Sequence, residues 1–144
     1  MNHVWTVVCE RSLIDKDSNN LSLINVIEQI QIGSLEEIPE GAPPPTGGGR
    51  IEVVTMWSRS NLETPETTNT RTIFYSPTGD ELVRNEPYID LTEFKRLRAR
   101  WLYIGLPPYS GDGQYTFVVQ QEVDGEWRTE AEVPLEISKI PSEQ

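Results

Sequence analysis

The sequence predicts an all-β protein, a sandwich of two antiparallel sheets with about seven to nine strands. Apolar side chains alternate with polar ones along most of the chain, and turn residues interrupt these runs at short intervals. The clearest stretch runs from Gly113 to Ile137, where two alternating runs flank the turn dipeptide Asp124-Gly125. An isolated hairpin is only marginally stable in water, so the rest of the chain must cover its apolar face.

Length and composition fit a single domain over residues 1–144. The formal net charge of −11 repels phosphate backbones and anionic lipid, which disfavours nucleic acid and membranes and leaves another protein as the expected partner. Cys9 is the only cysteine, so no intramolecular disulfide forms. The sequence starts without a leader pattern and has no apolar run long enough to span a membrane, so we expect a cytoplasmic protein.

The first third of the chain supplies the expected N-terminal strands. Residues 3–10 form a nearly continuous apolar run, as in a strand covered on both faces. Residues 21–32 continue it as a hairpin partner, with Ile24, Val26, Ile30 and Ile32 on one buried parity. A helix over 21–32 also fits the spacing of several apolar residues, but the density of β-branched side chains favours a strand.

The opening of the chain resembles a family of small, uncharacterised bacterial proteins. The residues that carry the likeness are Cys9-Glu10-Arg11, the run from Leu13 to Lys16, and the run from Asn19 to Glu28. A looser Gly-x-Tyr-x-Phe pattern at residues 113–117 extends it. The resemblance implies an immunoglobulin-like or C2-like β-sandwich, and it implies no known activity and no catalytic residues.

The middle of the chain alternates between strands and connections. Residues 33–49 are rich in Glu, Pro and Gly and are expected to be an exposed loop. Residues 50–59 read as a strand with Ile51, Val53, Thr55 and Trp57 on one face. Residues 60–70 are expected to be a second exposed loop, followed by a strand at 71–75, a turn at 76–79 and a partner strand over 82–89 that Pro87 weakens.

Residues 90–104 allow two interpretations. The spacing Asp90-x-x-Glu93 is that of a capping box, and a helix from there would place Leu91, Phe94, Leu97 and Trp101 on one stripe. If the helical turn ends near Phe94, a strand follows with Leu97, Ala99, Trp101 and Tyr103 on one face and three arginines on the other. The strand propensity of residues 101–104 favours the second interpretation.

Two groups of polar residues are candidate sites. Asp15, Asp17 and Asn19 place oxygen donors at alternate positions, as calcium loops do, but the glycine and glutamate of an EF-hand are missing. A C2-like site could add Asp112 or Asp124, whereas the favoured interpretation is an Asx-rich turn between two strands.

The second group is the row Arg96, Arg98 and Arg100, which contradicts the acidic composition. It could bind an acidic partner or ligand through bidentate contacts. We favour internal ion pairs with the polar face of the last strand, namely Glu130, Glu132 and Glu136.

The remaining chemistry is sparse. Cys9 lies in an apolar run and is expected to be a buried, inert thiol, while His3 is expected to be solvated. All four tryptophans fall on apolar parities and are expected in the core. The sequence therefore predicts a non-enzymatic protein-interaction or structural module with no catalytic residues and no cofactor. The alternative is a calcium- or small-ligand-binding domain that uses the Asp15 loop, and an exposed edge strand also allows a homodimer.

Overall fold

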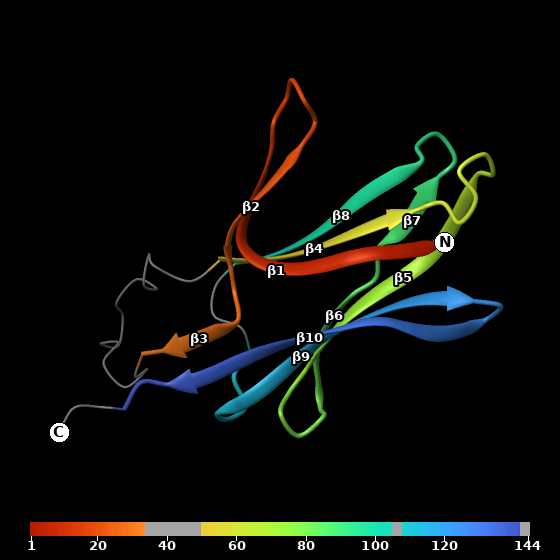
Figure 1. The fold of residues 1–144 in the computed structure, drawn as a ribbon. Helices are drawn as coiled ribbons and strands as arrows, with labels where there is room; N and C mark the ends of the chain where they lie inside the picture. Colours follow the sequence, from red (N-terminus) through yellow and green to blue (C-terminus); the bar gives the residue numbers. More distant parts are fainter. Residues whose placement is uncertain (34–49, 105–107, 142–144) are drawn as a thin grey trace.

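The computed structural model describes residues 1–33, 50–104 and 108–141, and within these ranges it contains ten strands and no helix long and apolar enough to cross a bilayer (Figure 1). The all-β sandwich is therefore confirmed, with one strand more than the upper limit expected. The strands are β1 (Asn2–Ile14), β2 (Leu21–Val26), β3 (Gln29–Ile32), β4 (Arg50–Ser58), β5 (Glu66–Tyr75), β6 (Glu81–Asn85), β7 (Tyr88–Leu91), β8 (Arg96–Ile104), β9 (Gly113–Val123) and β10 (Glu126–Lys139).

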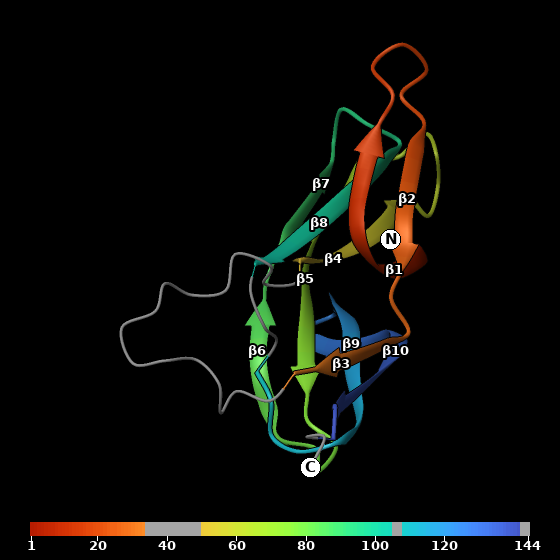
Figure 2. The same cartoon turned by 90° about the vertical axis from the view of Figure 1, so that its left-hand side faces the viewer.

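The strands form two sheets that pack face to face (Figure 2). One has the order β2-β1-β4-β8, and the other has the order β3-β10-β9-β5-β6, with β7 paired to the remaining length of β5. Neighbouring strands are antiparallel except for β3, which runs parallel to β10. The expectation of a wholly antiparallel sandwich is corrected at that one strand.

The predicted hairpin from Gly113 to Ile137 is present as β9 and β10, with Asp124 and Gly125 at positive φ in its turn. A bulge between Thr129 and Ala131 shifts the register of β10. Trp127 therefore lies opposite Glu122, and its side chain is not on the face that carries the apolar residues of the rest of β10. Trp127 is 37% exposed, and the guanidinium of Arg71 lies 4.1 Å from its ring centroid. The prediction that this tryptophan is in the core was wrong because the bulge was not foreseen.

The predicted continuous strand over residues 21–32 is divided between the two sheets. β2 ends at Val26, which is exposed, and β3 starts at Gln29 beside β10. Two main-chain hydrogen bonds guide the crossing, from the Ile27 amide to the Val8 carbonyl at 2.8 Å and from the Glu136 amide to the Glu28 carbonyl at 3.0 Å. Ile32 of β3 is 3% exposed in the core, and Ile27 and Ile30 pack against the core while partly buried.

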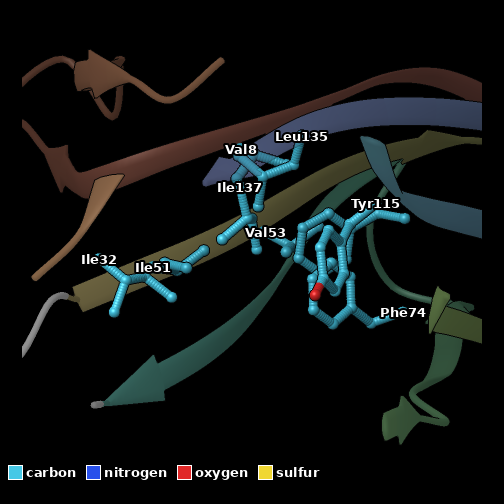
Figure 3. Packing of buried hydrophobic residues seen from close by; sticks show 9 residues of the cluster. Val8, Ile32, Ile51, Val53, Phe74, Tyr115, Leu135 and Ile137 are labelled. Carbon is cyan, nitrogen blue, oxygen red and sulfur yellow. The ribbon is translucent and has the colours of Figure 1, made fainter. Parts of the chain in front are cut away.

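Apolar side chains from the inner faces of both sheets fill the core (Figure 3). Aromatic rings stack at its centre, with the Phe74 centroid 4.4 Å from that of Phe117 and 5.4 Å from that of Tyr115. Trp57 anchors a second cluster with β7 and β9. The first cluster comprises Val8, Ile32, Ile51, Val53, Phe74, Tyr115, Phe117, Leu135 and Ile137.

Of the two predicted loops, the structure describes only the second in full. Most of the 33–49 loop, residues 34–49, lies outside the described residues. The 60–70 loop is shorter than expected, because β5 begins at Glu66 and its first residues pair with β7. Threonines at 67, 68 and 70 favour the extended backbone, and both the amide and the hydroxyl of Thr70 donate to the Pro87 carbonyl, at 3.1 and 2.6 Å.

Residues 88–104 follow the strand interpretation rather than the helical one. β7 ends at Leu91, and Asp90 accepts hydrogen bonds from the Thr92 amide and hydroxyl at 2.9 and 2.7 Å, an Asx turn in place of a helix cap. β8 then pairs with β4 along its whole length without a bulge. Its parity is as predicted, since Val53 faces Trp101 and Ile51 faces Tyr103 on the core side.

Candidate binding groove

The last part of β1 leaves the sheet and lies over the outer face of β4 and β8. β1 pairs with β4 as far as Cys9, and from there it pairs with β2 instead, so the two form a projecting hairpin (Figure 1). The carboxylate of Glu52 in β4 holds this bend, because it accepts hydrogen bonds from the Ser12 amide at 2.9 Å and from the Ser12 hydroxyl. Arg50 donates to the same carboxylate at 2.6 Å.

Glu52 is 1% exposed, which is unusual for a carboxylate. Burial alone would raise the pKa of this carboxyl, but the hydrogen bonds from Ser12 and Arg50 outweigh burial, and the pKa is lowered. Glu52 is therefore a charged anchor between the sheet and the folded-over hairpin. Sequence reasoning missed it, because its partners are distant in sequence or on the same strand.

A groove of about 620 Å³ lies between this hairpin and β8, and we call it the β8 groove. Its volume is in the range of pockets that bind small ligands or short peptide segments. Four strands, one turn and the connection before β8 supply its lining. The lining residues are Trp5, Ile14, Asn19, Asn20, Leu21, Met56, Phe94, Lys95, Arg96, Leu97, Arg98 and Arg100.

The three arginines of the predicted row all line the β8 groove. Arg98 Nη2 donates to the main-chain oxygen of Asn19 at 3.0 Å and to its Oδ1 at 3.2 Å, and Arg100 Nη1 donates to Ser12 Oγ at 3.2 Å. Within residues 1–33, 50–104 and 108–141, no carboxylate lies within 4.0 Å of any of the three guanidinium groups. In the described part of the chain, the acceptors of Arg98 and Arg100 are therefore neutral.

The predicted ion pairs between this row and the last strand were wrong. Glu130, Glu132 and Glu136 belong to β10, in the other sheet, whereas the arginines lie on the outer face of the first sheet. Glu130 instead accepts from Arg128 at 2.6 Å and from Gln121 at 2.8 Å. Opposite parity within one strand identified the polar face correctly, but it could not show which strand that face meets.

The floor of the β8 groove combines apolar side chains with one arginine. Trp5, Met56 and Arg98 lie side by side across β1, β4 and β8, so an indole, a thioether and a guanidinium share one row. Phe94, on the connection before β8, is 61% exposed. Lys95 adds a fourth cation, held by a 3.3 Å contact to the exposed carboxylate of Glu63. The prediction that Trp5 lies in the core was wrong, because the register shift between His3 and Trp5 turns its side chain to the groove side. Sequence reasoning also missed Phe94 and Lys95, although the run from Phe94 to Arg100 already mixes apolar and basic residues.

The candidate calcium residues form a turn of the β1–β2 hairpin. Asp15 Oδ1 accepts hydrogen bonds from the Asp17 amide, the Ser18 amide and the Ser18 hydroxyl at 2.8 to 3.0 Å, and these bonds lower its pKa. This is the Asx turn that the sequence favoured. Both oxygens of Asn19 accept hydrogen bonds from Arg98. The candidate calcium turn and the arginine row, which were predicted as separate sites, are therefore in contact.

Asp112 and Asp124 do not join this turn. Asp112 contacts Tyr109 and the Lys139 amide, and Asp124 lies in the β9–β10 turn, far from the β1–β2 turn (Figure 1). Among the residues that the structure describes, no three His, Cys, Asp or Glu side chains gather in a way that could hold a metal ion.

The two unique reactive side chains are structural. Cys9 is fully buried as predicted, and burial raises the pKa of its thiol. The prediction of a solvated His3 was wrong: the imidazole is half-buried, its ring centroid lies 5.2 Å from that of Trp57, and Nε2 is 2.7 Å from Thr6 Oγ1. Burial lowers the pKa of His3 despite the opposing charge of Glu130.

No protein-family model and no curated protein matches this sequence. Among solved structures, the chain is similar to a glycosyl hydrolase family 2 (GH2) member from Bacteroides cellulosilyticus DSM 14838, with a TM-score of 0.50 and 12% identity. The aligned region covers 61% of this chain and 12% of that chain. This likeness agrees with the β-sandwich fold and carries no further conclusion at such low identity.

Proposed function

We propose that this domain is a non-enzymatic module that binds an acidic segment of another protein in the β8 groove. The observation that supports the proposal is the gathering of Lys95, Arg96, Arg98 and Arg100 along a groove in which no described lining residue is a carboxylate. Guanidinium groups bind carboxylates through paired, charge-assisted hydrogen bonds, which fix both position and direction. Neutral acceptors hold Arg98 and Arg100 in place for such contacts.

The overall charge favours a short acidic segment over a long polyanion. Four of the 12 basic residues line the groove, while the chain carries 23 acidic residues. A nucleic acid would extend beyond the groove over a negative surface, which repels phosphate. A few acidic side chains of a protein segment fit inside the cationic area alone.

The apolar side chains in the floor of the groove indicate that the partner also presents apolar residues. Trp5, Met56 and the exposed Phe94 are side chains of the kind that dominate binding energy at protein interfaces. A fitting segment therefore carries apolar residues next to its acidic ones. The known lining offers no imidazole, thiol or carboxylate to act as a general base or nucleophile, which supports binding rather than acid–base chemistry.

Selection from random displayed heptapeptides tests this proposal. The wild-type protein is compared with R96S/R98S and with the control R84S/R128S, whose arginines are exposed and lie on β6 and β10. Arg100 is left intact because it contacts Ser12 at the hairpin bend. We expect the wild type and the control to enrich sequences rich in Asp and Glu, and R96S/R98S to lose that enrichment. Equal enrichment by all three proteins, with each shown to be folded by its thermal melt, would overturn the proposal.

A further inference from the structure

We infer that the acidic segment binds as an added β-strand along the free edge of β8; this inference rests on the proposed function and specifies its geometry. β8 is the last strand of its sheet, and among the described strands it is hydrogen-bonded only to β4. β7, which precedes it, pairs with β5 instead. Its register with β4 is unbroken from Arg96 to Ile104, without the bulge or proline that commonly protects an edge.

The spacing of the arginines matches a strand ligand. Arg96, Arg98 and Arg100 occupy alternate positions on one face of β8. Alternate residues in a strand are about 6.6 Å apart, and a strand paired with β8 has the same repeat. Acidic side chains at every second position of the ligand would therefore each lie beside one arginine, as favourable cross-strand pairs do.

The other face of β8 adds a second requirement. Leu97, Ala99 and Trp101 point toward the core side. They are only half-buried, because β8 lies at the edge of its sheet. Apolar side chains at the intervening positions of an added strand would face the core side, away from Trp5 and Met56, and would extend this partly covered surface. The ligand that fits is an extended segment in which acidic and apolar residues alternate.

A second copy of this chain fits the β8 edge poorly. Complete antiparallel overlap of two β8 strands would place Arg100 opposite its own copy and collect six arginines on one face, where like charges oppose pairing. Each copy also carries a net charge of −11, which adds repulsion between the two molecules. A homodimer, if one forms, is therefore not expected to use β8.

A backbone methylation series tests the strand geometry. The probe is a capped seven-residue peptide that alternates Glu and Val, with each amide N-methylated in turn and affinity for the wild-type protein measured by calorimetry. Only alternate amides of an added strand face β8, so methylation there is expected to weaken binding by about tenfold, while the intervening positions change it by less than about twofold. Hydrogen exchange provides a second readout, because alternate β8 amides should exchange more slowly in the complex.

The outcomes separate this inference from the proposed function. Peptide binding that requires Arg96 and Arg98 but shows no period-two methylation pattern would overturn strand addition and leave the acidic-segment proposal standing. Failure of the unmethylated peptide and of every displayed acidic sequence to bind the wild type would overturn both. A period-two pattern with slowed exchange along residues 96–104 supports the added strand.

Discussion

Replacement of Glu52 by alanine is expected to lower the free energy of unfolding by about 2 to 6 kcal/mol. The Glu52 carboxylate accepts hydrogen bonds from the Ser12 amide and from the Ser12 hydroxyl, whose oxygen also accepts from Arg100. Alanine leaves both buried donors without that acceptor, and each costs about 1 to 3 kcal/mol. Arg50 is 44% exposed, so water replaces its lost contact at little cost.

Urea denaturation and a thermal melt measure this loss. A loss of about 4 kcal/mol corresponds to a decrease in Tm of roughly 10 to 15 °C in a domain of this size. Glu52→Gln is the matched control, because it keeps the size of the side chain and one acceptor oxygen, and it should cost less than alanine. An alanine variant within about 0.5 kcal/mol of the wild type would refute the anchoring role of this carboxylate.

The same anchor has a pH signature. The pKa of Glu52 is lower in the folded protein than its ordinary value of 4.5, so the unfolded state binds the proton more readily. Its contribution to stability is therefore complete above about pH 4.5 and is lost as the pH falls through the folded pKa. The stability of Glu52→Gln should depend less on pH in that window, and an unchanged slope would contradict the assignment.

Three further predictions concern single side chains. Burial lowers the pKa of His3 despite the charge of Glu130, so NMR should give a pKa below 6.5. The free energy of unfolding should then fall as the pH drops below 6.5, because the unfolded state binds the proton more readily. An NMR pKa above 6.5, or the same decline in stability in His3→Gln, would contradict this. Trp127→Phe should reduce the iodide-accessible part of the fluorescence, because Trp127 is the most exposed of the four indoles, Trp5 and Trp101 are half-buried and Trp57 is fully buried; unchanged quenching would place Trp127 in the core. Arg59 is 8% exposed and donates to three main-chain carbonyl oxygens, so Arg59→Met should cost about 2 to 4 kcal/mol in urea denaturation, and a loss below about 0.5 kcal/mol would refute its role.

Local pattern was enough to predict the faces of the strands but not their partners. Period-two alternation placed Trp57 and Trp101 toward the core correctly, because an unbroken strand fixes which side each residue faces. It failed at Trp5 and at Trp127, because an irregularity in each strand reverses the parity. It also failed at the step from Val26 to Gln29, because the parallel partner of β3 is supplied by the far end of the chain.

The candidate groove was visible in the sequence only in part. The arginine row was identified from the local contrast with an acidic chain, but its contacts were assigned to the wrong strand. The actual neighbours of Arg98 and Arg100 are Asn19 and Ser12, which reach β8 because β1 bends over the sheet. That bend depends on Glu52, a charged residue whose burial no hydrophobic pattern indicates.

The salt dependence of peptide affinity tests the central claim most directly. The alternating Glu and Val peptide is titrated into the wild type, R96S/R98S and R84S/R128S at increasing salt. We predict that the wild type and the control bind alike and weaken as salt rises, whereas R96S/R98S binds at least about tenfold more weakly with little salt dependence. Equal affinities for all three proteins, or wild-type binding that salt does not change, would contradict recognition of acidic segments by the β8 groove.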